Sequence, residues 1–502
     1  MRHCRGKEII FMSTEEIALQ AQEAEDAKRL KRFKFLYPFY EFCASLSKAF
    51  STYVTFFYTN VFMFSVNFTA TITLTSSLIS WIGTPVFAAF VDSFSFKNAK
   101  YWPWVLIGSL LVNGGTMLII ALPALTGKTV ELMYVVFIIR IIMTVVTPMS
   151  STPMSGAFPK MSKDPSDRQY FGMAQKVGRD GGKTIFGYVV PAMLIALSGG
   201  SQDPTMAGYA ITAAICYGIT IFGFWAFALA GLKGSYVERE ALQETKAKKA
   251  NKVPLSAMVK TIIGNRQVLG MFIFFSLHKS YYFIYTSYAA YVFRYVFQDL
   301  GKIGTFMTVF NLTAIIGVMF GPLWTKLWKE SKRAIVTCFM AHMAFLVIML
   351  LTFKTGGANL FIILFGCSSF FMGMLETWVL PNFAAAADYG AWKTGARMDT
   401  LTMAIYSMCM TVCMVITTLV ATAFLNSFDY TGWLQQYNAG AVGITDAVVN
   451  GLSNLFTLAP LVLSALSLCA LVFIYNMTDD KLRKIQADLA EGKTAATSEW
   501  KF

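Results

Sequence analysis

The sequence predicts an all-α integral membrane protein whose twelve transmembrane helices form two bundles of six. Three observations support this fold class. Of the 502 residues, 56% are hydrophobic and only 14% are charged, whereas soluble globular domains carry roughly 25% charged residues. The apolar residues lie in long blocks, and a helix needs ~20 mostly apolar residues to cross the bilayer core. The blocks also form two groups of six, separated by a long hydrophilic insert.

Each apolar block has the length of one membrane-spanning helix. The first six blocks occupy residues 35–62, 69–90, 104–122, 132–155, 170–197 and 208–231. The second six occupy residues 268–293, 303–327, 334–353, 360–380, 403–425 and 455–477. We therefore expect a cytoplasmic N-terminal segment (1–34), an N-terminal bundle (35–232), a cytoplasmic basic linker (233–266), a C-terminal bundle (267–477) and a cytoplasmic C-terminal tail (478–502).

The positions of Lys and Arg predict that both chain ends are cytoplasmic. The net charge is +14, and the basic residues concentrate in every second loop. The loops assigned to the outer side hold only Lys128, Lys302 and Lys354. Because Lys and Arg are enriched in the cytoplasmic loops of membrane proteins, this charge pattern indicates a multi-pass protein of the cell membrane. It indicates topology rather than a nucleic acid partner.

Two short helices are expected outside the spans. Residues 13–16 read STEE, which resembles a capping box for a helix that precedes the first span. Leu482, Ile485 and Leu489 give the C-terminal tail an apolar stripe at helical spacing. We expect both helices to lie at the membrane interface.

Cysteine and histidine spacing gives no sign of a metal centre or a disulfide framework. The cysteines are scattered, and the close pair Cys409 and Cys413 lies in apolar sequence. The three histidines, His3, His278 and His342, are far apart. The chain shows no metal-ligand spacing, no nucleophile–base pair and no phosphate-binding loop. We therefore expect no metal, no cofactor and no catalytic residue, and a protein that is not an enzyme.

Ionisable residues inside the apolar blocks are the first group of candidate site residues, because a charge within the membrane usually faces a cavity or another charge. They are Glu41 and Lys48 in the first block, Arg140 in the fourth, Lys176, Arg179, Asp180 and Lys183 in the fifth, His278, Lys279 and Arg294 in the seventh, and Glu376 in the tenth. The four residues of the fifth block share one helical stripe. Asp180 neutralises at most one of the three cations on that stripe.

The remaining cations of the stripe need either carboxylates from other helices, such as Glu41 and Glu376, or a charged or polyhydroxylated ligand. For each of these residues taken singly, a structural ion pair is the alternative, and it applies in particular to Lys48, Lys183 and Arg294. We assign Glu41, Lys48, Lys176, Arg179 and Glu376 as candidate ligand contacts.

Aromatic residues are the second group of candidates. Tyr281, Tyr285 and Tyr288 recur at helical spacing in the seventh block. An aromatic ring offers a flat apolar face to a ring-shaped ligand such as a sugar, and the phenol adds a hydrogen bond. The alternative, which the pattern slightly favours, is that these rings pack between helices or lie in the interfacial belt. Tyr281, Tyr285 and Trp378 complete the set of candidate ligand contacts.

Three hydrophilic motifs follow the second, fourth and tenth blocks. They read PVFAAFVDSFSFKNAKYWPW with Asp92, Lys97 and Lys100, PMSGAFPKMSKDPSDRQYFG with Asp164 and Arg168, and ADYGAWKTGAR with Asp388, Lys393 and Arg397. Together they resemble the glycoside–pentoside–hexuronide:cation symporters, the melibiose-permease-like branch of the major facilitator superfamily. The third motif is the most specific. The resemblance implies the major facilitator fold, and the eight named residues are then candidates for a cytoplasmic gate in which carboxylates and cations pair and separate.

The sequence departs from this family pattern in the second and fourth spans. Known members carry paired aspartates before the proline of the second span and a further one in the fourth. Here Ser80 and Thr84 stand in the second span and Ser151 in the fourth. Neutral oxygens alone bind Na⁺ poorly, so a proton is the more favoured coupling ion. The candidates for coupling-ion contacts are Glu41, Asp180, Glu376, Ser80 and Thr84, and the resemblance aligns the family's basic sugar contact with Lys176.

The resemblance implies a secondary active transporter that moves a sugar, glycoside or hexuronide across the cell membrane by alternating access. Cation symport is expected, with H⁺ favoured over Na⁺. The alternative is a lipid or amphiphile transporter of the same fold, which is compatible with the missing carboxylates and a Phe- and Met-rich interior. We expect a monomer in the lipid bilayer with a small-molecule substrate.

Overall fold

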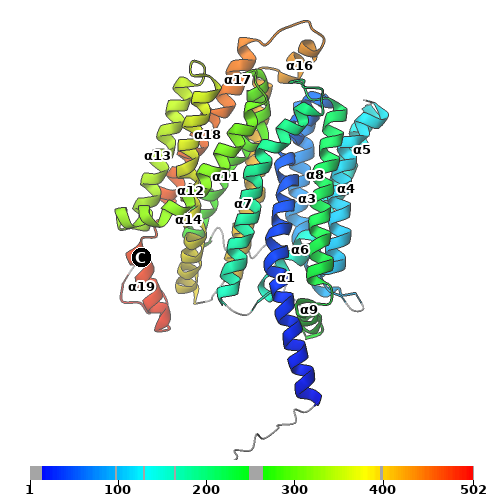
Figure 1. The fold of residues 1–502 in the computed structure, drawn as a ribbon. Helices are drawn as coiled ribbons and strands as arrows, with labels where there is room; N and C mark the ends of the chain where they lie inside the picture. Colours follow the sequence, from blue (N-terminus) through cyan, green and yellow to red (C-terminus); the bar gives the residue numbers. More distant parts are fainter. Residues whose placement is uncertain are drawn as a thin grey trace, which may run out of the picture.

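The computed structural model describes residues 14–96, 99–127, 130–162, 165–247, 264–395 and 399–500. These residues form a bundle of long helices (Figure 1). The N-terminal half contains α1 (Thr14–Ser51), α2 (Val54–Phe56), η1 (Phe57–Val61), α3 (Val66–Ser93), α4 (Trp102–Thr126), α5 (Val130–Val146), α6 (Pro148–Ala157), η2 (Phe158–Lys160), α7 (Pro165–Ala196), α8 (Met206–Ala226) and η3 (Phe227–Leu232).

The linker contributes α9 (Tyr236–Ala247). The C-terminal half contains α11 (Arg266–Tyr295), α12 (Lys302–Trp328), α13 (Ser331–Thr352), α14 (Gly357–Thr394), α15 (Asp399–Ser427), α16 (Tyr430–Asn438), α17 (Asp446–Phe456), α18 (Leu458–Cys469) and η4 (Ala470–Ile474), followed by α19 (Asp479–Ala490) in the tail. Across the two halves, α7 packs on α12 and α3 packs on α15.

Eight helical stretches among the described residues are long and apolar enough to cross a membrane. They are Trp102–Thr126, Glu131–Met154, Met206–Leu232, Lys302–Trp328, Ser331–Thr352, Gly357–Thr394, Met408–Ser427 and Asp446–Ile474. The other four predicted blocks form α1, α3, α7 and α11, three of which carry the ionisable residues of the candidate site. All twelve blocks are therefore helical, while twelve membrane crossings stay a prediction.

The first helix begins well before the first apolar block. α1 runs without a break from Thr14 to Ser51, so the short separate helix expected near residue 13 is instead the beginning of α1. This part of α1 projects from the bundle at the same end as α9 and α19 (Figure 1). The two ends of the described chain thus lie on one side of the molecule, and α16 and α17 lie at the opposite end.

The linker helix α9 is fastened to the N-terminal half by one buried carboxylate. Glu238 is 3% exposed and accepts hydrogen bonds from three successive backbone N–H groups at the start of α4, those of Lys100 (2.5 Å), Tyr101 (2.9 Å) and Trp102 (2.7 Å). Burial raises the pKa of Glu238, and these three N–H groups oppose the rise. The carboxylate satisfies backbone donors that a helix start leaves without intrahelical partners.

The tail helix α19 packs on protein rather than lying free at the interface. Ile485 is fully buried, and Leu482 and Leu489 pack against the same apolar cluster of the C-terminal half. The expectation of an interfacial helix is therefore wrong for this stripe, because α14 extends far enough to offer the stripe an apolar surface.

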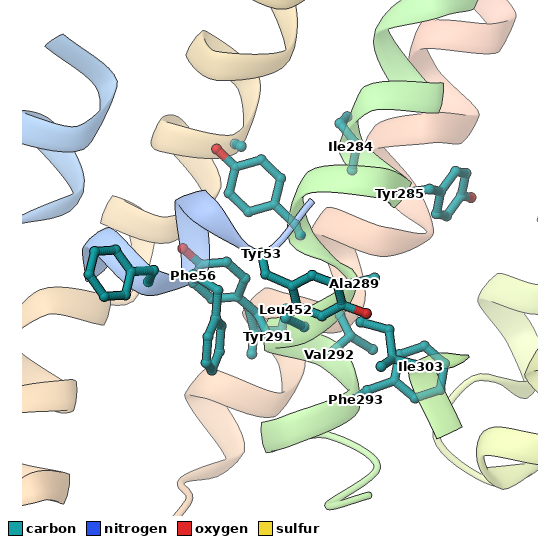
Figure 2. Packing of buried hydrophobic residues seen from close by; sticks show 14 of the residues in the cluster. Tyr53, Phe56, Ile284, Tyr285, Ala289, Tyr291, Val292, Phe293, Ile303 and Leu452 are labelled. Carbon is teal, nitrogen blue, oxygen red and sulfur yellow. The ribbon is translucent and has the colours of Figure 1, made fainter. Parts of the chain in front are cut away.

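The largest apolar cluster joins the two halves at the end of the molecule where α16 and α17 lie. Tyr53 and Phe56 of the N-terminal half pack beside Tyr291 of α11 and Leu452 of α17 (Figure 2). The rings of Phe56 and Tyr291 meet edge to face, with centroids 5.1 Å apart. At this end the halves are in tight apolar contact.

Candidate functional site

Glycines bring the two charged helices of the N-terminal half together. A Cβ atom on Gly178 of α7 would lie 2.5 Å from the carbonyl oxygen of Pro38 on α1, and one on Gly182 would overlap the hydroxyl of Ser45. Only glycine permits such an approach of two helix backbones. The close packing holds Glu41 of α1 beside the charged stripe of α7.

The buried acid of this group is Glu41, which is 5% exposed. Gln175 of α7 donates a hydrogen bond from its Nε2 to Glu41 Oε1 over 3.0 Å. One turn further along α7, Arg179 Nε lies 3.4 Å from Asp180 Oδ1. The structure thus brings predicted residues of the first and fifth blocks together, and it pairs Asp180 with its own neighbour.

Lys48 and Lys183 extend this cluster of charges. Lys48 is exposed and lies within electrostatic range of Glu41, Lys183, Arg179 and Asp180. Among the described residues, neither Lys48 nor Lys183 forms an ion pair. The cluster therefore holds more cations than anions, as the sequence predicts.

The C-terminal half contributes a second ionic cluster, in which one carboxylate serves two basic groups. Lys279 Nζ contacts Glu376 Oε1 as an ion pair, and His278 Nε2 lies 3.5 Å from the same oxygen. The exposed fraction of the side chain is 28% for Glu376, 13% for Lys279 and 1% for His278. The Lys279 ammonium also lies over the rings of Phe275 and Tyr282, at 5.7 and 5.1 Å from their centroids. Glu376 is therefore the member of the cluster that reaches open space.

The two clusters lie near one another where the halves meet, because both are within electrostatic range of one side chain. Tyr406 of α15 lies within electrostatic range of Glu376 and Lys279 from its own half and of Arg179 from α7. Its ring stacks on Phe275, with centroids 5.2 Å apart and planes 21° from parallel. A ligand between the halves would meet cations and a carboxylate on both walls.

The candidate aromatic contacts lie elsewhere. Tyr281 and Tyr285 are fully buried inside the C-terminal half, and Tyr285 packs against Phe365 with ring centroids 4.5 Å apart. Trp378 donates its indole N–H to Thr325 Oγ1 over 2.9 Å and is 6% exposed. In this conformation Tyr281, Tyr285 and Trp378 pack between helices, as the alternative interpretation of the aromatic residues has it. Their contact with substrate stays a prediction.

Other candidate site residues are only partly described. Ser80 lies on α3 with a half-buried side chain. The side chains of Thr84 and Lys176 lie outside the described part of the structure, and so do those of the gating candidates Asp92 and Arg168. Lys97, Asp164 and Arg397 lie outside the described residues altogether.

Three gating candidates have contacts that stay within one half. Lys100 is buried and donates from Nζ to the carbonyl oxygen of Phe94 over 3.2 Å. Asp388 Oδ2 accepts a hydrogen bond from Gln486 of α19 over 3.1 Å. Lys393 donates to the carbonyl oxygen of Gly264 over 3.2 Å.

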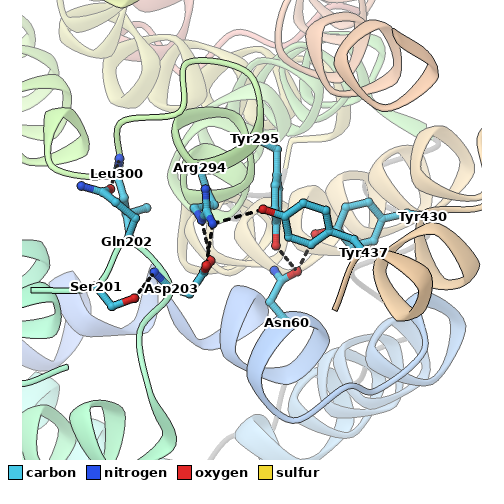
Figure 3. A network of polar contacts seen from close by, with 9 residues as sticks. All are labelled: Asn60, Ser201, Gln202, Asp203, Arg294, Tyr295, Leu300, Tyr430 and Tyr437. Carbon is cyan, nitrogen blue, oxygen red and sulfur yellow. Dashed lines mark hydrogen bonds and ion pairs between the residues drawn. The ribbon is translucent and has the colours of Figure 1, made fainter. Parts of the chain in front are cut away.

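The opposite end is closed by polar contacts between the halves (Figure 3). Arg294 of α11 forms a two-pronged ion pair with Asp203 of the α7–α8 loop, with both N–O distances 2.5 Å. Asn60 of η1 accepts hydrogen bonds from Tyr295 (3.2 Å) and Tyr430 (2.6 Å) of the C-terminal half. For Arg294, the alternative to a ligand contact was a structural ion pair, and the structure contains that ion pair.

Sequence reasoning noted His278 and Lys279 among the ionisable residues of the apolar blocks but did not assign them as ligand or coupling-ion contacts, and it did not find the partners of the closed end. The available signal for His278 and Lys279 was their position as two adjacent ionisable residues in an apolar block. Asp203 and Asn60 lie in loop and helix-end positions where polar residues are ordinary, so they carried no signal. Among the described residues, no group of three His, Cys, Asp or Glu side chains is placed to hold a metal ion.

Comparison with known proteins identifies the family of the chain. The family described as MFS/sugar transport protein matches residues 43–479. An uncharacterized symporter of Bacillus subtilis, YjmB, is 23% identical over 83% of this chain and 85% of its own length. The isoprimeverose transporter of Lactiplantibacillus pentosus is 25% identical over 73% of this chain and 74% of its own length.

The fold has the same support from solved structures. The crystal structure of the nucleoside transporter NupG superposes with a TM-score of 0.60 at 13% identity, covering 89% of this chain and 99% of that one. At this identity the likeness concerns the fold alone. The match of the family over most of the chain, the apolar helices and the charged space between two halves lead to one conclusion: this chain belongs to the MFS/sugar transport protein family of multi-pass membrane transporters.

Proposed function

We propose that the protein moves a sugar, glycoside or hexuronide across the cell membrane by alternating access, driven by the symport of a proton. The observation that carries this proposal is the meeting of two ionic clusters, one from each half, around Tyr406. A site shared by two rocking halves is the arrangement on which alternating access depends. The proposed transporter acts as a monomer and needs no resident metal or cofactor.

The proposed topology has twelve spans and cytoplasmic chain ends. All twelve apolar blocks are helical, and the beginning of α1 lies at the same end of the molecule as α9 and α19 (Figure 1). The Lys- and Arg-rich loops support the cytoplasmic assignment of this end. The end closed by Arg294 and Asp203 is then the outer one, and the conformation faces inward.

The charges of the site favour an acidic sugar among the proposed substrates. Lys48 and Lys183 form no ion pair with the described residues, and Arg179 has only the adjacent Asp180. Uncompensated cations attract an anionic ligand into a cleft. A carboxylate such as that of a hexuronide supplies the missing negative charge.

A proton is the proposed coupling ion, because carboxylates at the central space can accept one. Ser80 offers a neutral oxygen in the span where the resembling symporters carry aspartates, which disfavours Na⁺. The Glu376 side chain is 28% exposed while its Oε1 is paired with Lys279, and Glu41 and Asp180 are the further carboxylates of the two clusters.

The geometry disfavours the alternative of a lipid or amphiphile carrier. Such a carrier needs an apolar surface for acyl chains, and removing a charge from water next to an acyl chain is costly. Here the walls of the central space present Arg179, Glu376 and Lys48.

Uptake by whole cells tests the proposal. The probes are radiolabelled methyl β-D-glucuronide and methyl β-D-glucoside, which differ only in the carboxylate at C6. We expect uptake above that of cells without the protein, faster for the glucuronide, abolished by a protonophore and unchanged when K⁺ replaces Na⁺. The variant Lys302→Gln, at a surface residue paired with Asp299 of its own half, is the control. Uptake of neither probe, or uptake that requires Na⁺, contradicts the proposal.

A further inference from the structure

One buried histidine adjoins the accessible carboxylate of the central space. His278 Nε2 lies 3.5 Å from Glu376 Oε1, and the ring itself is 1% exposed. Its other nitrogen, Nδ1, lies 3.1 Å from the hydroxyl of Tyr281. Glu376, His278 and Tyr281 therefore form a continuous polar chain that runs from the open space into the C-terminal half.

Both ring nitrogens of His278 have a partner that can accept a hydrogen bond. In the charged imidazolium, both nitrogens are donors. Nε2–H would donate to the carboxylate of Glu376, and Nδ1–H would donate to the oxygen of Tyr281. A proton added to His278 thus gives each N–H group an acceptor within 3.5 Å. A buried polar group is stable when its hydrogen bonds are complete.

The surroundings hold this ring in place from several helices. On α11 itself, Phe274 stacks on the His278 ring with centroids 5.7 Å apart. From α13, His342 stacks on Tyr281 with centroids 5.1 Å apart and shares a hydrogen bond with Ser368 of α14 over 2.8 Å.

The titratable and charged groups that surround the His278–Glu376 pair come from five helices. They are Lys279, Tyr281 and Tyr282 on α11, Cys338 and His342 on α13, Tyr406, Cys409 and Cys413 on α15, Arg179 on α7, and Glu376 itself on α14.

We propose that His278 and Glu376 together form the site that binds the coupling proton, with Lys279 as the fixed counter-ion of the carboxylate. This inference rests on the proposed function, since it assigns a place to the proton of that symport. Among the described residues, the other two carboxylates make no hydrogen bond or ion pair with a histidine: Glu41 accepts a hydrogen bond from Gln175, and Asp180 pairs with Arg179.

The site explains how proton binding and substrate binding strengthen one another. Before protonation, Lys279 and Glu376 cancel in charge and His278 is neutral. One proton taken from the cytoplasm or the medium raises the charge of the cluster by one positive unit. The more positive wall then binds an anionic sugar more tightly, and the bound anion in turn holds the proton. Reciprocity of this kind is required whenever two ligands are coupled.

Calorimetry on the purified full-length protein measures this coupling without transport. Binding of methyl β-D-glucuronide is recorded in two buffers of different ionisation enthalpy, which gives the number of protons taken up for each ligand bound. We expect about one proton per ligand in the wild type and close to none in His278→Gln. The affinity of the wild type for methyl β-D-glucuronide should rise by about 5- to 150-fold from alkaline to mildly acidic pH. In His278→Gln the affinity should depend much less on pH.

His342→Gln is the matched control, because His342 is equally buried in the same ring stack and does not touch Glu376. It should keep the proton count of the wild type. The proposal is overturned if His278→Gln takes up as many protons for each bound ligand as the wild type. It is also overturned if both variants lose proton uptake equally, because the loss would then come from disturbed packing. A wild type that binds the sugar without a proton contradicts the proton symport itself.

A substrate-free measurement separates this inference from the identity of the sugar. Infrared difference spectra of the purified protein between alkaline and acidic pH report the protonation of buried imidazole and carboxyl groups. We expect an imidazole band that is absent in His278→Gln and shifted in Glu376→Gln, and that persists in His342→Gln. A band that survives in His278→Gln overturns the assignment whatever the transported substrate is.

Discussion

Arg294 and Asp203 join the two halves of the molecule at its closed end through two parallel N–O contacts of 2.5 Å. The Arg294 side chain is 12% exposed and that of Asp203 is 62% exposed. Arg294 also donates to the hydroxyl of Tyr437 over 3.3 Å. Two-pronged pairing fixes the mutual orientation of the two groups, so this contact holds the end shut only while the halves keep their present angle.

Replacement of Arg294 by Gln should shift the protein toward the state that is open at this end. A partly exposed pair contributes up to about 1 kcal/mol, which is roughly a fivefold change in the ratio of the two states. Thr73 lines a small pocket between α3 of one half and α11 and α15 of the other. The measurement is the rate at which a cysteine at this position reacts with a membrane-impermeant maleimide, and we expect the rate to rise.

The control for this experiment is Arg333→Gln, because Arg333 pairs with Glu330 within one half. A charge swap that places Asp at 294 and Arg at 203 should restore the slow reaction. Unchanged labelling in Arg294→Gln would show that the apolar cluster alone keeps this end closed.

Replacement of Asp388 by Asn should slow transport and leave the affinity for substrate nearly unchanged. Asp388 accepts a hydrogen bond from the tail residue Gln486 in this conformation, and we expect it to enter a latch when the halves close at this end. Initial uptake rates and equilibrium binding are measured together. Gln486→Ala is the control that removes the contact seen here, and a loss of binding in Asp388→Asn would refute a latch role.

Replacement of Glu238 by Ala should destabilise the N-terminal half, because three N–H groups at the start of α4 lose their acceptor. A lost helix cap costs about 1–2 kcal/mol. The midpoint of thermal unfolding, followed by tryptophan fluorescence in detergent, should fall. Glu238→Gln keeps one acceptor oxygen and should fall less, and equal midpoints for all three proteins would show that this cap is unimportant.

The tail should detach from α14 at acidic pH. Asp488 accepts the indole N–H of Trp392 (2.8 Å) and of Trp500 (3.0 Å). Hydrogen bonds, led by that of Ser498, hold the pKa of Asp488 below its ordinary value. The carboxylate therefore stabilises docking above the ordinary Asp pKa of about 3.9, and this stabilisation disappears as the pH falls through the lowered pKa.

Asp488→Asn should reproduce the acid state at neutral pH. The stacked rings of Trp392 and Trp500, with centroids 5.1 Å apart, would separate and the tail would become accessible. Limited proteolysis of the tail measures this, with Asp480→Asn at an exposed site of α19 as the control. A tail that resists the protease equally in Asp488→Asn and wild type would refute the role given to this carboxylate.

Most of the fold could be predicted from the sequence, because burial in a bilayer imposes long apolar stretches that are visible without coordinates. The details that failed depend on packing. The block at 132–155 is divided at Thr147 by the start of α6 at Pro148, and the block at 455–477 is divided at Thr457 between α17 and α18. α1 begins at Thr14 because a charged sequence also forms a helix when it leaves the membrane.

The site was predictable in its composition but not in its pairings. Charges within apolar blocks identified the stripe of α7 and Glu376, since such charges are costly without a role. The partner of Glu376 lies 97 positions away at Lys279, and sequence spacing along one helix says nothing about contacts between helices. The aromatic candidates show the same limit: helical spacing places Tyr281 and Tyr285 on one face, and only packing shows that this face points into the C-terminal half.

Equilibrium binding of methyl β-D-glucuronide to purified Arg179→Gln tests whether the space between the two halves is the substrate site. Arg179 approaches the cluster of the opposite half and has only a 3.4 Å contact with Asp180. The dissociation constant should rise by about tenfold or more, while the unfolding temperature stays that of the wild type. An unchanged dissociation constant in a protein that still binds the sugar would place the substrate elsewhere.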